Sequence, residues 1–171
     1  MIPVSSLRFP GPRTMSSNIS YHTGDIFSSD AGILVCPVNC VGVMGGGLAK
    51  TFAEKVPYLE EDYKRMCKEE RLRIGTIIIW QGWWEKAVLL FPTKRHYQEM
   101  SKLWYISDGL MTMMEDWYAA TALMRDNKSV AFPRLGCGLG GLNWTNVRPV
   151  MEERLKRLPT KVQIWLPTPE E

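Results

Sequence analysis

Short apolar runs alternate along this chain with stretches whose apolar residues recur at helical spacing. Gly32–Val38 reads GILVCPV, a continuous apolar run typical of a strand buried on both faces. Leu48, Phe52 and Val56 recur at every fourth position, which favours a helix. The pattern predicts strands over Ile19–His22, Gly32–Val38, Ile74–Trp80, Ala87–Phe91, Ser129–Phe132 and Lys161–Trp165, and helices over 48–56, over 57–70, from a Ser101 cap to about Arg125, and over about Thr145–Arg157.

This alternation of strands and helices predicts an α/β fold with a mostly parallel sheet covered on both faces. The sequence after its first residues shows no internal repeat, low-complexity tract or linker, and 171 residues suit one domain with a proper core. Residues 1–17 contain Pro3, Pro10 and Pro12, so we expect a flexible leader there and a single domain over 18–171.

Composition and charge disfavour several classes of protein. The apolar and charged fractions, 45% and 23%, are those of a globular chain, and no apolar run approaches the roughly 20 residues of a membrane span. The net charge of +3 permits contact with a polyanion without demanding it. The four cysteines form no Cys-x-x-Cys pair and only two histidines accompany them, so we predict no metal site. With no secretion signal in view, reduced thiols in the cytoplasm are the expected state.

Two glycine-rich loops carry the strongest functional signal. In residues 38–52 (VNCVGVMGGGLAKTF) and 131–147 (AFPRLGCGLGGLNWTNV), a buried strand runs into glycines and then into a helix. Glycine lets a ligand approach the backbone without meeting a Cβ, and the N–H groups of such a loop and helix start bind anions. Two such loops predict a ligand with two phosphates, held from both sides. A P-loop and a dinucleotide-binding fingerprint are disfavoured, because neither Gly-Lys-Ser/Thr nor a βαβ unit follows the glycines.

Several short motifs occur in an order that resembles the macrodomain family. They are Thr23-Gly24-Asp25-Ile26, Pro37-Val38-Asn39-Cys40, the glycine run of residues 44–48, and PRLGCGLGG at residues 133–141. FPTKRHY at 91–97 and NCVGVMG at 39–45 are similar to the subgroup of DNA ADP-ribosyl glycohydrolase antitoxins (DarG) and terminal ADP-ribose protein glycohydrolases. The resemblance spans about Ile19 to Trp165 and implies a three-layer α/β/α macrodomain with a central, mostly parallel mixed sheet of about six strands.

The resemblance implies ADP-ribose as the ligand and gives roles to matching residues. Asp25 would accept a hydrogen bond from the adenine amino group, and Asn39 would bind either hydroxyls of the distal ribose or the backbone of its own loop. Trp165 would either stack on adenine or pack in the core, the commoner fate of a tryptophan at a strand end. The implied ADP-ribose-binding residues are Asp25, Ile26, Asn39, Val43, Met44, Gly45, Gly46, Gly47, Leu48, Thr93, Leu135, Gly136, Cys137, Gly138, Leu139, Gly140 and Trp165.

The same resemblance points to Lys94 as the catalytic residue, with Asn39 and His96 as further candidates. In the subgroup, the lysine after Phe-Pro-Thr lies at the distal ribose. Lys94 would either attack the anomeric carbon, which requires the amine to lose its proton first, or stabilise the departing group as an ammonium ion. His96 is the candidate general acid, because imidazole titrates near neutral pH.

Gly140 stands where some protein-directed members of the subgroup carry an aspartate, so the resemblance favours ADP-ribose on a DNA base. The implied function is an ADP-ribosyl glycohydrolase that removes ADP-ribose from DNA, on thymidine first, in an antitoxin or anti-defence role in bacterial or phage-infected cytoplasm. Removal of phosphate from ADP-ribose 1″-phosphate, de-ADP-ribosylation of protein, and non-catalytic ADP-ribose reading remain alternatives. We expect a monomer that needs no cofactor or metal, contacts single-stranded DNA transiently and contacts no membrane.

Overall fold

The computed structural model describes residues 17–124 and 126–169 of the chain. The leader predicted over 1–17 therefore lies outside the described residues, except for Ser17. The strands are β1 (Ile19–Thr23), β2 (Ile33–Val38), β3 (Ile78–Trp80), β4 (Ala87–Pro92), β5 (Val130–Phe132) and β6 (Val162–Leu166), and the helices are the short 3-10 helix η2 (Ile26–Ser28), α1 (Gly47–Lys55), α2 (Leu59–Lys68), α3 (Leu103–Ala120) and α4 (Trp144–Leu155).

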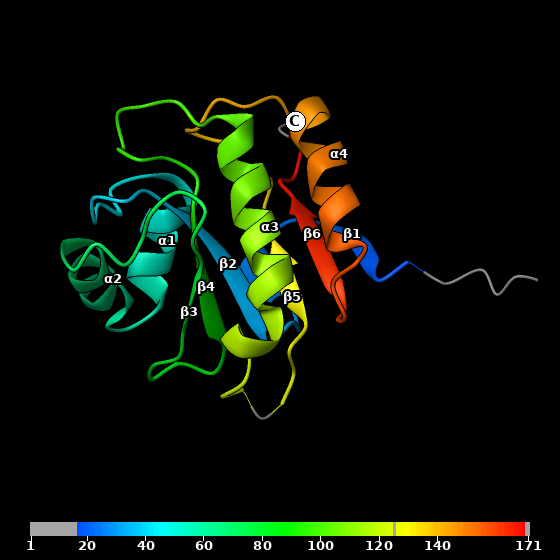
Figure 1. The fold of residues 1–171 in the computed structure, drawn as a ribbon, viewed down its shortest axis with the longest axis horizontal. Coiled ribbons are helices and arrows are strands. Elements are labelled where there is room, and N and C mark those ends of the chain that lie inside the picture. The colour runs from blue at the N-terminus through cyan, green and yellow to red at the C-terminus, as the bar shows by residue number, and fades with distance from the viewer. Residues whose placement is uncertain (1–16, 125, 170–171) are drawn as a thin grey trace, which may run out of the picture.

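The six strands form one mixed sheet in the order β1-β6-β5-β2-β4-β3 (Figure 1). All neighbouring pairs are parallel except β3 and β4, which are antiparallel. The prediction of a mostly parallel mixed sheet is confirmed. The last pair is antiparallel because β3 and β4 are joined by a short connection around Gly82, which cannot cross over the sheet.

Helices cover the sheet on both faces, and alternate residues of β2 show why. Ile33 and Val35 pack in one buried cluster with residues of α3 and α4, including Ile106 and Met151. Their neighbours Leu34 and Cys36 pack in a second cluster with residues of α1 and α2. Because successive side chains of a strand point to opposite faces, a run that is apolar throughout requires cover on both sides. The structure is therefore the three-layer α/β/α arrangement expected (Figure 1).

Several element boundaries differ from the sequence predictions. Helix α3 begins at Leu103, because the Ser101 N–H donates to the Gly140 carbonyl (2.9 Å) and Ser101 belongs to the preceding loop rather than to a cap. The helix ends at Ala120, where the Thr121 hydroxyl bonds the Trp117 carbonyl (2.8 Å); the predicted end, Arg125, lies outside the described residues.

Two other predicted elements are shorter in the structure. Helix α2 begins at Leu59 rather than Pro57, since Tyr58 has a left-handed backbone (φ 66°). Strand β3 begins at Ile78 rather than Ile74, because Thr76 and Arg73 close a turn (N to O, 3.0 Å) in which Gly75 has a φ of 85°.

A proline in the middle of the sheet marks where the strands separate. β2 pairs with β4 from Ile33 to Val38 but with β5 only at Ile33 and Leu34. The Ile33 N–H points toward β5, where it donates to Ser129 (3.0 Å), so position 37 on the same strand faces β5 as well. Pro37 has no N–H to donate, and it is tolerated here because β5 has already diverged.

The connections after β2 and β5 leave the sheet on opposite faces. β2 leads to α1, whose Phe52 packs in one cluster, and β5 leads to α4, whose Val147 packs in the other. Adjacent parallel strands whose connections diverge in this way form a crevice at their carboxyl ends, which is the usual ligand site in open α/β sheets. Among the described residues, no helix is both long and apolar enough to cross a membrane.

Candidate functional site

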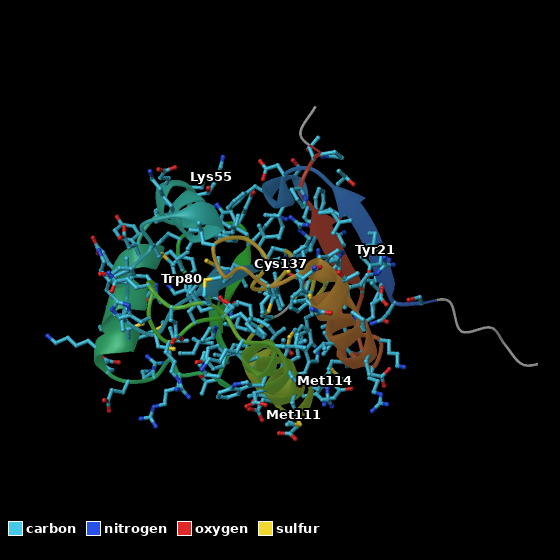
Figure 2. The ribbon with its side chains drawn as sticks, turned by 90° about the horizontal axis from the view of Figure 1, so that it is seen from above. Tyr21, Lys55, Trp80, Met111, Met114 and Cys137 are labelled. Atoms are coloured by element: carbon cyan, nitrogen blue, oxygen red, sulfur yellow. The ribbon has the colours of Figure 1, made fainter. Side chains whose placement is uncertain are left out.

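A cavity of about 640 Å³ opens at the carboxyl ends of β2, β4, β5 and β6. Its size is in the range of small-molecule sites in proteins. Figure 2, viewed from above, shows the loop that carries Cys137 near the centre of the molecule, between α1 and α2 on one side and α3 and α4 on the other. The cavity is lined by Pro37, Val38, Asn39, Val43, Gly45, Gly46, Gly47, Leu48, Ala49, Thr93, Lys94, Tyr97, Pro133, Arg134, Gly136, Gly138, Leu139, Gly140, Trp165 and Pro167.

Asn39 organises the first glycine loop, residues 39–47. Its side-chain Oδ1 accepts hydrogen bonds from the Val41 N–H (3.0 Å), the Val43 N–H (3.4 Å) and the Tyr63 hydroxyl (2.7 Å). Its Nδ2 donates to the Val43 carbonyl (2.8 Å). An amide nitrogen has two protons, so one N–H remains to bind a ligand at the cavity wall. The structure thus shows Asn39 holding its own loop while it also lines the cavity.

The N-terminus of α1 faces the cavity and presents free donors. Gly46 occupies the N-cap without a side-chain hydrogen bond, and Gly46, Gly47, Leu48 and Ala49 all line the cavity. Within the described part of the chain, the N–H groups of residues 45–49 donate no hydrogen bond. Unpaired N–H groups at a helix start, combined with the helix dipole, attract an anion.

The second glycine loop, residues 136–141, contributes donors from the loop alone. The N–H groups of Gly138, Leu139 and Gly140 have no acceptor within residues 17–124 and 126–169. The start of α4 is different, because the Asn143 side chain caps it by accepting from the Thr145 N–H (2.9 Å), and none of its residues lines the cavity. The two loops therefore resemble each other in sequence, but only the first adds a helix N-terminus to the site.

The charge of the cavity wall is entirely positive. Lys94 and Arg134 are lining residues, and no aspartate or glutamate from the described ranges joins them. Arg134 is the second residue after β5, and its guanidinium makes no ion pair within those ranges. Two cations and two sets of unpaired N–H groups around one cavity favour a ligand with more than one negative charge.

Lys94 and Leu139 together span the cavity. The Lys94 Nζ donates to the carbonyl oxygens of Leu139 (3.0 Å) and Tyr97 (3.4 Å), so it joins the loop after β4 to the second glycine loop. The Leu139 side chain reaches the opposite wall, where its Cδ1 would lie 3.1 Å from a Cβ at Gly46 and 3.3 Å from one at Gly47. A larger residue at either position would have to displace Leu139 slightly, and at Gly47 a φ of +57° also favours glycine.

Most of the predicted site residues line this cavity, but some do not. Met44, Leu135 and Ile26 are buried in the core, and Cys137 is half-buried with its thiol directed to the Leu135 carbonyl. His96 lies beside the cavity rather than in its wall, with Nδ1 accepting from the Gln98 N–H (3.2 Å) and its ring against Tyr97.

Sequence reasoning assigned no role to Arg134 and Tyr97, which both line the cavity. Their position shortly after the ends of β5 and β4 is the signal that could have found them, since side chains at the carboxyl edge of a parallel sheet surround its ligand site.

The far end of the cavity is bounded by Trp165 and Pro167. The Trp165 ring is half-buried, stacks on His22 with centroids 4.9 Å apart, and bonds Gln163 through Nε1 (2.9 Å). Asp25 does not line the cavity; it caps η2 by accepting from the Phe27 N–H (2.9 Å). It nevertheless lies near this end, because the adjacent Gly24 N–H bonds the Leu166 carbonyl (2.9 Å).

Neither metal ligands nor an activated thiol mark this site. No group of three or more His, Cys, Asp or Glu side chains within the described residues is placed to hold a metal ion. Burial raises the pKa of the Cys137 thiol and raises that of Cys40 to about 11, so both thiols are protonated at neutral pH.

Comparison with known proteins gives this fold and site a family context. The macro domain family matches residues 35–151. The DNA ADP-ribosyl transferase-DNA ADP-ribosyl glycohydrolase fusion protein of Thermosipho africanus is 35% identical over 175 residues, which cover 90% of this chain and 43% of that protein. The structure of Thermosipho africanus DarTG in complex with ADP-ribose has a TM-score of 0.80 and 35% identity, covering 90% of this chain and 43% of that one. The structure of the macrodomain of Mycobacterium tuberculosis DarG has a TM-score of 0.77 and 34% identity, and the match covers 89% of this chain and 98% of that one. The chain thus spans less than half the length of the curated relative it matches.

Proposed function

This chain belongs to the macrodomain family, and on that premise we propose that it binds ADP-ribose and hydrolyses the bond that joins ADP-ribose to a DNA base. The observation that carries the proposal is the anion-binding character of the cavity. Its wall has two cations and two sets of unpaired backbone N–H groups, and none of the described residues that line it is an aspartate or glutamate. ADP-ribose carries two adjacent phosphates. Relatives named for DNA ADP-ribosyl glycohydrolase activity support the reaction.

In the proposed complex the ligand runs from Trp165 to Lys94. Adenine stacks near Trp165, with Asp25 accepting from its amino group, and the diphosphate lies between residues 45–49 and 138–140, whose N–H groups are unpaired. The distal ribose then reaches the free N–H of Asn39 and the Lys94 ammonium group. Ile26, Met44, Leu135 and Cys137, which do not line the cavity, support the loops that do.

Hydrolysis breaks the bond between the anomeric carbon and the base, forms a carbon–oxygen bond to water, and delivers a proton to the departing base. Lys94 donates hydrogen bonds to two carbonyl oxygens, an arrangement suited to an ammonium group that stabilises the departing base. Attack by the Lys94 amine would require those bonds to break and a proton to leave. Borohydride distinguishes the two roles, because it would trap a covalent lysine adduct as an added mass on the chain.

A DNA substrate rather than a protein adduct is supported by the space around Gly140. A Cβ at Gly140 would lie 2.3 Å from the Ser101 Oγ and 2.5 Å from the Gly136 carbonyl oxygen, so an aspartate does not fit there. We place the activity in bacterial or phage-infected cytoplasm, as an antitoxin or anti-defence function. The protein acts as a monomer that contacts single-stranded DNA transiently. The four free cysteines accord with a reducing compartment.

The test is release of ADP-ribose from an oligonucleotide ADP-ribosylated on thymidine. We expect turnover by the native chain, unaffected by chelator, and a loss of about 100-fold or more in Lys94→Ala, because an electrostatic group at the reaction centre contributes on that scale. Lys68→Ala, at the exposed end of α2, is the matched control and should retain full activity. Calorimetry with free ADP-ribose checks that both variants still bind the ligand.

Three outcomes would contradict the proposal in different ways. If calorimetry detected no heat of binding with ADP-ribose at millimolar concentration, ADP-ribose would be ruled out as the ligand. Binding without turnover would indicate an ADP-ribose reader, and phosphate release from ADP-ribose 1″-phosphate without action on the oligonucleotide would indicate the phosphatase.

A further inference from the structure

Large apolar side chains that are exposed to solvent surround the end of the cavity at Lys94. Tyr97 is 48% exposed, Met100 60% and Leu139 69%. Met100 lies on the second glycine loop, since a Cβ at Gly141 would be 2.0 Å from its Cε, and Tyr97 and Leu139 line the cavity. These three residues form what we call the Lys94 rim. Exposed apolar groups that gather beside a polar site indicate a contact surface.

The Lys94 rim lies where the part of the substrate beyond ADP-ribose must emerge. The Lys94 Nζ bonds the backbone carbonyls of two rim residues, Leu139 (3.0 Å) and Tyr97 (3.4 Å). A group bonded to the anomeric carbon beside Lys94 is therefore within reach of both side chains. This step rests on the proposed function, which puts the reacting carbon at Lys94.

Cations flank the rim on its α3 side. The Arg95 guanidinium lies 5.6 Å from the centre of the Trp104 ring and 5.5 Å from that of Tyr105, and the Lys102 Nζ lies 5.6 Å from the Tyr105 ring. Trp104 is itself 46% exposed. Glu99 also contacts Arg95, but its carboxylate accepts a hydrogen bond from the Arg95 backbone N–H. The Arg95 guanidinium therefore stays beside the aromatic rings. Arg95, Lys102 and Trp104 make up what we call the cationic flank.

We propose that the Lys94 rim is a nucleobase platform, on which the ADP-ribosylated base stacks against Tyr97 while the cationic flank contacts phosphates of the adjoining strand. Aromatic and apolar side chains interleaved with cations are the means by which proteins hold single-stranded nucleic acid. The base must be unpaired, because in a duplex its faces are covered by neighbouring bases and its edge is occupied. A peptide adduct would make less use of a flat ring beside two cations.

The experiment compares Tyr97→Ala with Tyr118→Ala, a variant that removes a 76% exposed tyrosine on the outer side of α3. Substrates are a single-stranded oligonucleotide ADP-ribosylated on one base and the corresponding duplex. We expect kcat/KM on the single strand to fall about 5- to 150-fold in Tyr97→Ala, the range for losing one base–aromatic stack. Tyr97→Phe keeps the ring and should recover most of the rate, and Tyr118→Ala should match the native chain.

Binding of free ADP-ribose separates this role from a structural one, because ADP-ribose has no base beyond the distal ribose. We expect its Kd to stay within about threefold in Tyr97→Ala, whereas a disturbed loop would weaken it further. The double variant Arg95→Ala, Lys102→Ala should flatten the salt dependence of strand binding, since fewer counterions are released.

Results that overturn the platform differ from those that overturn the proposed function. Equal rates for native chain and Tyr97→Ala on the single strand would reject the platform while leaving the hydrolase intact. So would an equal effect of Tyr97→Ala on an ADP-ribosylated protein, or faster cleavage of the duplex than of the single strand. Absence of turnover by the native chain would instead reject the function on which the platform rests.

Discussion

Asn39 and Tyr63 form the smallest unit on which the site depends. The Tyr63 hydroxyl is buried and lies 2.7 Å from Asn39 Oδ1 and 2.9 Å from the Asn39 carbonyl oxygen. Burial raises the pKa of this hydroxyl, so it remains a donor at any ordinary pH. Because Oδ1 receives the donors, Nδ2 is the end that donates, and it has one N–H beyond its bond to the Val43 carbonyl. Tyr63 is therefore a positioning residue for Asn39.

Tyr63→Phe removes that donor while keeping the ring in place. We expect unfolding free energy to fall by about 0.5–1.5 kcal/mol, the usual contribution of one hydrogen bond, and ADP-ribose affinity to fall about 3- to 10-fold because the Asn39 amide loses its fixed orientation. Tyr105→Phe is the matched control, since Tyr105 is equally buried and its hydroxyl has no partner within the described residues. Denaturant titration and calorimetry measure the two quantities, and equal effects of both substitutions would contradict the assignment.

At the scale of single elements, the second glycine loop is held by close backbone contacts. Gly136 has a φ of +72°, in the left-handed region that glycine adopts without strain, and the Gly140 carbonyl accepts from the Ser101 N–H (2.9 Å). Gly140 therefore lies directly against Ser101 and the Gly136 carbonyl, with no room for a side chain. These contacts fix the backbone of the loop whose Gly138, Leu139 and Gly140 line the cavity.

Gly140→Ala should force the loop out of this position. A Cβ at 2.5 Å from the Gly136 carbonyl oxygen cannot be relieved by a side-chain rotation, so we expect a loss of about 1–3 kcal/mol in unfolding free energy and much weaker ADP-ribose binding. Gly138→Ala is the control for stability, because a Cβ there would have no neighbour within 4 Å. If thermal unfolding of Gly140→Ala matched that of Gly138→Ala, the contact would not limit the loop.

The elements and the loops differ in how far the sequence predicts them. GILVCPV predicts a strand covered on both faces, and Leu34 and Ile33 do pack in opposite clusters. The glycine runs predict the cavity, because the missing Cβ atoms are a property of the sequence itself and let a ligand approach the backbone. That Arg134 and Tyr97 line the cavity does not follow from the glycines, since strand position marks only their loops and the side chain of a loop that faces a cavity is decided by tertiary contacts. Ser101 illustrates the same limit, because the N–H of Ser101 bonds Gly140 instead of serving a helix start.

At the scale of the whole molecule, a hydrogen-bonded contact joins the edge strand β1 to helix α4. The Tyr21 hydroxyl of β1 donates a hydrogen bond to the Glu152 carboxylate of α4. Arg148 bonds the same carboxylate (2.8 Å), and its guanidinium lies 4.9 Å from the centre of the Tyr21 ring. Burial and the bond to Glu152 raise the pKa of Tyr21 to about 12, and the bonds from Tyr21 and Arg148 lower that of Glu152. Figure 2 shows Tyr21 at the side of the molecule, away from the loop that carries Cys137.

Tyr21→Phe should therefore destabilise the fold in a pH-dependent manner without affecting catalysis. Both groups are more than a third exposed, so we expect a loss of only about 0.5–1 kcal/mol near neutral pH. The raised pKa of Tyr21 means that its contribution is complete below pH 10 and is lost as pH rises toward 12. The depressed pKa of Glu152 means that its contribution is complete above its unfolded value and is lost as pH falls. Urea unfolding of both proteins across pH checks this, and a constant difference would contradict it.

Pro37 has a consequence for how the ligand enters. Since Pro37 has no N–H to donate, the ladder between β2 and β5 cannot be extended by a hydrogen bond from this position. A ligand that binds there would not have to break a hydrogen bond between β2 and β5 at this position. Pro37, the penultimate residue of β2, thus favours a preorganised opening at the carboxyl ends of β2 and β5, which lowers the conformational cost of binding.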